Sequence, residues 1–286
     1  QISCQVLVVG AGPGGYVAAI RAAQLGLDTI IVEGDRAGGT CLIRGCIPSK
    51  AIIHAAERFE SLKAHQSGHM GLKVGGDVSI DMPALVDWKN KIVDKLNKGV
   101  EALLKKNGVR LITGWASFLD GKTCNVTDSD GNKIAHISTE NVILATGSQP
   151  IELPFMPYDE EHIISSTGAL DLDKLPEKIA VIGGGYIGLE LGCALRKLGV
   201  EITVIEGLDT VVSIFDAEIR RPLELWLKKN KVIVHTNCLA QGAEIGDDGV
   251  DLSWKNKEGD LISETFDKIL VTVGRKANTN GWGLEE

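Results

Sequence analysis

The sequence has few cysteines, few aromatic residues and no long apolar run. Six cysteines in 286 residues are too few for a disulfide-stabilised scaffold, so we expect a reducing compartment. In such a compartment a close cysteine pair is a candidate for catalysis rather than for structure. No apolar stretch approaches the roughly 20 residues that a membrane-spanning helix needs, and no signal peptide precedes the first predicted strand. We therefore expect no membrane partner.

Positive charge is not in excess either. The net charge is −8 and the pI is about 5.4, which argues against nucleic acid or an anionic membrane as a partner. The lysine-rich stretch 89–106 also contains Asp94 and Glu101, and we expect it to form the solvated face of a helix. The six histidines show no metal-ligand spacing, so no metal site is predicted.

The chain is long enough for two domains of ordinary size, and one pattern occurs in it twice. An apolar strand over 5–9, a helix over 14–25 and a strand over 29–33 form a predicted βαβ unit. The same order recurs over 178–182, 186–198 and 201–206. Gly10 and Gly183 are 173 positions apart, and so are Glu33 and Glu206. This shared register predicts two copies of one nucleotide-binding architecture.

Each copy ends with an apolar strand that a glycine closes, at Gly147 and at Gly274. The proline-rich segment 149–157 has the composition of a connection between domains. We expect an α/β protein with two Rossmann-like, doubly wound dinucleotide-binding domains and parallel sheets. The predicted boundaries are 1–149 for the first domain, 150–275 for the second, and 276–286 for the start of a return to the first.

Glycine-rich turns follow the first strand of each copy. In such a turn the glycines permit a tight bend, a close approach to a pyrophosphate and close packing of the helix on the strand. The acids Glu33 and Glu206 stand 18 residues beyond the last glycine, where a carboxylate accepts a ribose hydroxyl. No arginine for a 2′-phosphate follows Glu206, which favours NAD over NADP. One such turn alone could be structural. The glycines concerned are Gly10, Gly12, Gly14, Gly15, Gly183, Gly185 and Gly188.

A cysteine pair lies between the two glycine-rich turns. Cys41 and Cys46 could be two of four zinc ligands, two unrelated core residues, or a redox pair. No further cysteine or histidine lies at short spacing, which disfavours zinc. Pro48 suits the first turn of a helix, so Cys46 is expected at a helix N-terminus, where the partial positive charge stabilises a thiolate. The sequence therefore favours the redox pair.

Other candidates have plainer interpretations beside the functional ones. Lys50 follows Cys46 by one helical turn, where its cation could stabilise a thiolate or a reduced ring. Without this context, a plain surface lysine would be the favoured interpretation. Glu190 could be an ordinary helix glutamate. The scattered cysteines are expected to fill the core, and these are Cys4, Cys124, Cys193 and Cys238.

The stretch Gly38-Gly-Thr-Cys41-Leu-Ile-Arg-Gly-Cys46-Ile-Pro-Ser-Lys50 resembles the pyridine nucleotide–disulfide oxidoreductases. With Gly-Gly-Gly-Tyr-Ile-Gly-Leu-Glu190 and Val-Gly274-Arg-Lys-Ala-Asn, the chain is most similar to the dihydrolipoamide dehydrogenase branch. The resemblance covers essentially the whole chain. It implies that FAD binds the first copy through Gly10 to Gly15, Glu33, Thr40, Lys50, Ala145, Thr146 and Gly147. It implies that NAD binds the second through Gly183 to Gly188, Tyr186, Glu206 and Gly274.

The same resemblance implies separate roles for the catalytic residues. Cys41 would be the interchange thiol that attacks the lipoyl group, and Cys46 the thiolate on the flavin side. Lys50 and Glu190 would pair beside the flavin, and Tyr186 would gate the nicotinamide pocket. Implied partners are the lipoylated carrier domains of 2-oxoacid dehydrogenase or glycine-cleavage complexes, in a homodimer of the bacterial cytoplasm or the mitochondrial matrix.

Two departures from the family pattern bear on these expectations. Ile43 and Arg44 stand where the family usually has Asn-Val or a similar pair. Arg44 could stabilise the thiolate or bias the redox potential, and a harmless exposed side chain is at least as consistent with the sequence. The family continues beyond position 286 with a segment that holds the flavin and a domain with a His-Glu acid–base pair. We therefore expect this chain to be a truncated flavoprotein. The alternatives are a sibling disulfide or mercuric reductase that uses NAD(P)H, and a non-catalytic nucleotide-binding fragment.

Overall fold

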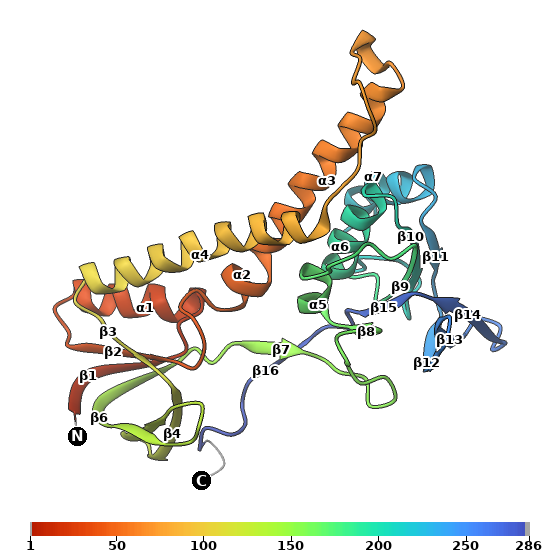
Figure 1. Cartoon of the computed structure of the whole chain (residues 1–286). Helices are drawn as coiled ribbons and strands as arrows, with labels where there is room; N and C mark the ends of the chain where they lie inside the picture. Colours follow the sequence, from red (N-terminus) through yellow and green to blue (C-terminus); the bar gives the residue numbers. More distant parts are fainter. Residues whose placement is uncertain (1, 284–286) are drawn as a thin grey trace. The chain divides into compact units, whose positions relative to one another are not determined.

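The computed structural model describes residues 2–283, and the chain forms two compact units (Figure 1). Unit 1 comprises residues 1–48, 90–149 and 276–286, and unit 2 comprises residues 49–89 and 150–275. Unit 2 thus includes 49–89, a segment that the sequence analysis grouped with the first domain. Gln1 and residues 284–286, which end the predicted return segment, lie outside the described residues.

The sheet of unit 1 has the strand order β3-β2-β1-β6-β5-β4. Strands β3, β2, β1 and β6 run parallel to one another. The pairs β6–β5 and β5–β4 are antiparallel. The strands are β1 (Ile2–Val9), β2 (Thr29–Glu33), β3 (Arg110–Thr113), β4 (Trp115–Asp120), β5 (Thr123–Thr127) and β6 (Lys133–Leu144).

Apolar residues cover both faces of this sheet. The side of Val6 and Val8 packs against helix α1 (Pro13–Gln24) and the later turns of α4 (Met82–Lys106), which lie alongside each other in Figure 1. The side of Leu7 and Val9 packs against β4 and β5. Because β1 is buried on both faces, it reads as a continuous apolar run, as expected for a central parallel strand. Unit 1 also holds the short helix α2 (Gly39–Arg44) and the start of α3 (Cys46–Gln66).

The sheet of unit 2 repeats this order as β11-β10-β9-β15-β8, with all pairs parallel. These strands are β8 (Ile163–Ile164), β9 (Lys178–Ile182), β10 (Glu201–Ile205), β11 (Ile233–His235) and β15 (Lys268–Val271). A three-stranded antiparallel sheet is formed by β12 (Leu239–Gly246), β13 (Gly249–Lys255) and β14 (Leu261–Phe266).

The side chains of β9 point alternately to the two faces of the sheet, and each face packs against a different apolar cluster. Ile179 and Val181 face a cluster that includes helices α5 (Ser166–Leu170), α6 (Tyr186–Lys197) and α7 (Ala217–Lys229). Ala180 and Ile182 face the antiparallel sheet, where Trp254 and Phe266 are almost fully buried. Short strands β7 (Ser148–Pro150) and β16 (Arg275–Ala277) pair where the chain passes between the units, and a 3-10 turn covers His69–Gly71.

The predicted α/β class with parallel Rossmann-type sheets is confirmed. The two copies match closely, since α1 and α6 begin and end at positions that differ by the same 173 residues as the turns. The expectation of a solvated lysine face was wrong at Lys89, which is buried. Its ammonium group donates to the carbonyl of Leu170 at 2.8 Å and forms an ion pair with Asp171.

Candidate active site and nucleotide-binding turns

The first glycine-rich turn lies at the carboxyl end of β1. Gly10 has φ of 96°, a left-handed conformation that favours glycine. A Cβ at Gly10 would lie 2.8 Å from the carbonyl carbon of Ala145, so the two backbones touch. Gly12 caps α1, and Pro13 supplies its first residue. The N-terminal N–H groups of α1 are thus at the strand end, where an anion binds.

Glu33 is bound to this turn by its side chain. Its carboxylate accepts the Ala11 N–H at 2.7 Å and the Asp35 N–H at 3.0 Å. Burial raises the pKa of the Glu33 carboxyl, while backbone hydrogen bonds and the positive charge of Arg44 partly oppose the rise. The acid therefore orients the turn and lies at the position where a ribose hydroxyl would bind.

The second turn repeats these contacts in unit 2. Gly183 has φ of 95°, and a Cβ there would lie 2.7 Å from the carbonyl oxygen of Thr272. The carboxylate of Glu206 accepts the Gly184 N–H at 2.6 Å and the Leu208 N–H at 2.8 Å. These donors are the counterparts of Ala11 and Asp35, so the repeat extends from sequence to individual hydrogen bonds. Gly185 caps α6, and Tyr186 begins it with a half-exposed ring.

The closing segments of the two copies also correspond. The N–H of Ala145 donates to Val9 at 2.8 Å, and the N–H of Thr272 donates to Ile182 at the same distance. In unit 1 the Thr146 hydroxyl donates to the carbonyl of Asn278 at 2.8 Å, and the Asn278 amide donates back to Thr146 at 2.9 Å. Sequence reasoning missed Asn278, since only the folded chain brings it beside Thr146.

The segment before Cys41 is tied to the first turn. The N–H of Gly38 donates to Ala11 at 2.7 Å, and the backbone of Gly39 lies directly against Gly12. Gly38 and Gly39 both have positive φ, at 116° and 61°. Any side chain at Gly39 would collide with Gly12, so the glycine pair is what allows α2 to start beside the nucleotide-binding turn.

The two cysteines occupy different local environments. Cys41 lies within α2 and is half-buried, as is Thr40 beside it. Cys46 is the first residue of α3, the helix N-terminus that Pro48 predicted, and its side chain is exposed. Gly45 separates the two helices, and a Cβ there would lie 2.8 Å from the carbonyl oxygen of Thr40. The short α2, which brings Cys41 toward the first turn, was not predicted.

Arg44 has a partner that the sequence analysis did not consider. It forms an ion pair with Asp35, the second residue after Glu33. Its charge therefore lies beside the turn that follows Glu33, and it acts to lower the pKa of the Glu33 carboxyl, against the larger effect of burial.

Lys50 and Glu190 form an ion pair in unit 2. The ammonium group of Lys50 lies 2.9 Å from Oε1 and 2.7 Å from Oε2 of Glu190. Lys50 follows Cys46 by one turn on α3, and Glu190 lies on α6, one turn beyond Tyr186. Both side chains keep substantial exposure, 57% for Lys50 and 39% for Glu190, so the pair adds little stability and mainly orients the cation.

The four scattered cysteines are all less acidic than a free thiol. Burial raises the pKa of Cys124 and of Cys193 to about 11, and it raises the pKa of Cys4 and of Cys238 as well. Among residues 2–283, no three His, Cys, Asp or Glu side chains are arranged to hold a metal ion. No helix in that part of the chain is long and apolar enough to cross a membrane.

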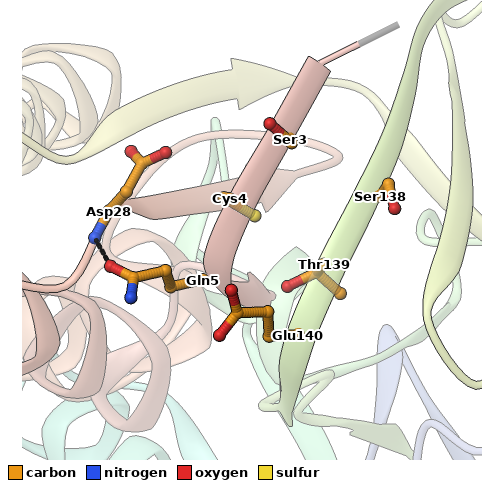
Figure 2. A pocket seen from close by; sticks show the side chains of 7 residues that line it. All are labelled: Ser3, Cys4, Gln5, Asp28, Ser138, Thr139 and Glu140. Carbon is orange, nitrogen blue, oxygen red and sulfur yellow. Dashed lines mark hydrogen bonds between the residues drawn. The ribbon is translucent and has the colours of Figure 1, made fainter.

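A hollow of 240 Å³ lies at the other end of the unit 1 strands (Figure 2). Figure 2 shows the N–H of Asp28 donating to the side chain of Gln5, at 3.0 Å. Nucleotides bind at the carboxyl ends of parallel strands, whereas this hollow is at the amino end of β1. It is lined by Ser3, Cys4, Gln5, Asp28, Ser138, Thr139 and Glu140.

Two Rossmann-type units, each with a glycine-rich turn and its acid, and a cysteine pair that follows the first turn define the class of fold. The sequence profile of the family described as pyridine nucleotide-disulphide oxidoreductase matches residues 4–286, and the chain belongs to this family. The resemblance stated from the motifs is thereby confirmed.

Similar proteins carry a more specific name. The chain is 46% identical to the dihydrolipoyl dehydrogenase of Geobacillus stearothermophilus, covering 100% of this chain and 59% of that enzyme. The dihydrolipoyl dehydrogenase of Pseudomonas aeruginosa is 45% identical, with 99% and 60% covered. Among solved structures, LpdA from Mycobacterium tuberculosis superposes with a TM-score of 0.87 at 27% identity, covering 98% of this chain and 61% of LpdA. The chain thus spans about three fifths of the length of these relatives.

Proposed function

We propose that this chain is part of a flavoprotein that oxidises dihydrolipoyl groups and passes the electrons through Cys41 and Cys46 and FAD to NAD. The observation that carries this proposal is the contact between Gly39 and Gly12, which holds the cysteine-bearing segment against the first nucleotide-binding turn. The names of the similar proteins from Geobacillus stearothermophilus and Pseudomonas aeruginosa support the substrate.

The first turn and its acid suit a dinucleotide. The backbone contacts at Gly10 leave no room for side chains that would block a pyrophosphate, and Glu33 is in place for a ribose hydroxyl. We assign FAD to unit 1, with Gly10 to Gly15, Glu33, Thr40 and the segment Ala145 to Gly147 around it. Lys50, which unit 2 contains, is assigned to the flavin by the family resemblance alone.

The second turn suits NAD by the same argument. Gly183 to Gly188, Glu206 and Gly274 are the residues assigned to it, with Tyr186 at the entrance to α6. Gly207 and Leu208 follow the acid, so no cation is present there for a 2′-phosphate. These residues would hold FAD in unit 1 and NAD in unit 2, and the two cofactors would supply a two-electron path from the reduced cysteine pair.

The cysteine pair supplies the substrate chemistry by thiol–disulfide exchange. In the oxidised pair, one substrate thiolate attacks the sulfur of Cys41, the Cys41–Cys46 bond breaks, and Cys46 leaves as a thiolate. The second substrate thiol loses its proton to a base and attacks the substrate sulfur bound to Cys41, which releases Cys41 and a lipoyl disulfide. The substrate loses two electrons and the cysteine pair gains them. Cys46 suits the leaving role, because the N-terminus of a helix stabilises negative charge.

Lys50 and Glu190 support this chemistry by fixing one positive charge. Because Glu190 accepts from Lys50 with both oxygens, the ammonium group is held in one orientation. We assign the pair a positioning role.

The expected partners are lipoylated carrier domains of 2-oxoacid dehydrogenase or glycine-cleavage complexes, and the expected assembly is a homodimer. A reducing compartment, either the bacterial cytoplasm or the mitochondrial matrix, follows from the same assignment. Two other assignments compete with this one. The first is a sibling reductase that consumes NADPH, which the residues after Glu206 disfavour. The second is a non-catalytic nucleotide-binding fragment.

The test measures the full-length protein that contains this sequence. NADH formation from dihydrolipoamide and NAD is expected, and Cys41→Ser and Cys46→Ser should each abolish it. Cys193→Ser serves as the matched control and should retain activity, because this thiol lies in α6 with a raised pKa. NADPH consumption with another disulfide or with mercuric ion would assign a sibling reductase. A protein that binds no flavin and shows no turnover would support the non-catalytic alternative.

A further inference from the structure

Trp115 is an aromatic residue that the proposed chemistry does not use. It opens β4, and its ring lies flat on Gly34. A Cβ at Gly34 would be 2.9 Å from each of three atoms in the middle of the indole, Cδ2, Cε2 and Cε3. Equal distances to these fused-ring atoms mean that Gly34 faces the ring plane rather than its edge. Trp115 nevertheless keeps 61% of its surface exposed.

The backbone fixes this ring beside the ribose-binding acid. Gly34 follows Glu33 directly, and the N–H of Gly114 donates to the carbonyl of Glu33 at 2.8 Å. Glu33 also pairs with Thr113 in the parallel ladder of β2 and β3. Trp115 therefore lies two residues after Thr113, the residue opposite the acid, and its ring lies over Gly34, the first residue after β2.

Unit 2 has the same arrangement with a different side chain. The N–H of Cys238 donates to the carbonyl of Glu206 at 2.9 Å, as Gly114 does to Glu33. The next residue, Leu239, lies 3.1 Å from the Cβ position of Gly207, the counterpart of Gly34. Leu239 is 62% exposed. The two units thus differ at one equivalent position, where unit 1 has an indole and unit 2 has an isobutyl group.

The covalent structure of a dinucleotide indicates which of its groups lies near Trp115. The acid accepts a ribose hydroxyl, and the base is attached to that same ribose, so the base lies just beyond the acid. An exposed indole at that point offers a flat aromatic surface, on which a purine stacks more strongly than on an aliphatic side chain.

The geometry points to Trp115 as the stacking surface for the adenine of the dinucleotide held in unit 1. This inference rests on the proposed function, which places FAD there. It gives unit 1 a stronger hold on its adenine than Leu239 allows in unit 2. That difference suits a cofactor that stays bound in one unit and a nucleotide that exchanges in the other.

The experiment uses the full-length protein, freed of flavin and titrated separately with FAD and with ADP. Trp115→Leu copies the residue of unit 2 and should weaken both ligands by on the order of tenfold, since base–aromatic stacking contributes about 1–3 kcal/mol. Trp115→Phe keeps an aromatic face and should bind within a few-fold of the parent. Quenching of tryptophan emission by ADP should occur in the parent and be reduced in both variants.

Gly34→Ala tests whether the position of the Trp115 ring matters, because it leaves the tryptophan itself unchanged. Its φ is not in the left-handed region, so alanine fits the backbone, but the methyl group displaces the ring. We expect weaker FAD binding although Trp115 is present.

The outcomes separate the two proposals. If the parent binds FAD, and Trp115→Leu binds FAD and ADP as tightly with unchanged quenching, the stacking role is wrong and the proposed function stands. If the parent binds no FAD, the proposed function fails first. If Trp115→Leu lowers the unfolding temperature but leaves both affinities unchanged, the ring only covers Gly34, and the inference is overturned.

Discussion

Arg44 and Asp35 form an ion pair that joins the cysteine-bearing helix α2 to the turn after Glu33. The sequence alone left Arg44 either as a charge that stabilises the neighbouring thiolate or biases the redox potential, or as an exposed side chain without a role. In the structure its guanidinium pairs with the carboxylate of Asp35 in the turn after Glu33. Its charge also opposes the burial-driven rise in the pKa of Glu33.

The first prediction concerns the strength of this pair. The side chains are 43% and 47% exposed, and exposed ion pairs contribute at most about 1 kcal/mol. A double-mutant cycle with Arg44→Ala and Asp35→Ala should therefore give a coupling energy below about 1 kcal/mol in urea unfolding. High salt should reduce it further. A coupling of several kcal/mol would mean that the pair is part of a larger buried network.

The second prediction compares two glycines of the first turn. Gly10→Ala places a methyl group against the backbone of Ala145 and forces alanine to a φ of 96°. Strain and overpacking together should lower the free energy of unfolding by at least about 2 kcal/mol. Gly14→Ala is the matched control, because a Cβ there meets no atom within 4 Å and lies in α1.

Chemical unfolding of both variants measures the difference. Gly14→Ala should change the free energy of unfolding by less than about 1 kcal/mol, in either direction. Equal destabilisation of the two variants would show that the close approach of Gly10 to Ala145 is not what constrains the turn.

Local patterns were enough to predict the repeated architecture. The buried apolar runs of β2 and β9, the glycines and the two acids are contiguous signals, and the structure repeats them down to the hydrogen bonds at Ala11 and Gly184. Contacts between distant segments could not be predicted in this way. The pairing of Thr146 with Asn278 and the packing of Trp115 on Gly34 join residues that have no common sequence pattern. Such contacts exist only once the sheet has brought its strand ends together.

The third prediction uses the thiol pKa values. With a pKa of about 11, Cys124 and Cys193 have only about one thiolate in a thousand molecules at pH 8, so they should resist alkylation in the folded, reduced protein. Iodoacetamide should label the exposed Cys46 first. Peptide mass spectrometry then assigns the labelled sites. The labelling rates of Cys124 and Cys193 should rise as the pH approaches 11.

Complete unfolding in concentrated guanidinium chloride provides the control, where all six cysteines should react. Native labelling of Cys193 at the rate of Cys46 would show that α6 opens readily, which would remove Cys193→Ser as a neutral control for the proposed enzyme.

The fourth prediction concerns Lys89, whose side chain is only 3% exposed. Its ammonium group donates to the last carbonyl of α5, at Leu170, and pairs with Asp171, which is 54% exposed. Lys89→Met keeps most of the buried volume but leaves the Leu170 carbonyl without its donor. Because Asp171 remains solvated, the loss should be limited to about 1–3 kcal/mol, the usual cost of one unsatisfied buried polar group.

Lys95→Met provides the comparison on the same helix, since Lys95 is exposed and should tolerate the change within about 0.5 kcal/mol. Urea unfolding of both variants measures the difference. If Lys89→Met is as stable as the parent, the free energy gained by burying the methionine side chain equals the free energy lost with the hydrogen bond to Leu170. The lysine would then be dispensable for the fold. A loss close to the predicted range would show that one buried cation completes the C-terminal end of α5 and holds α4 against it.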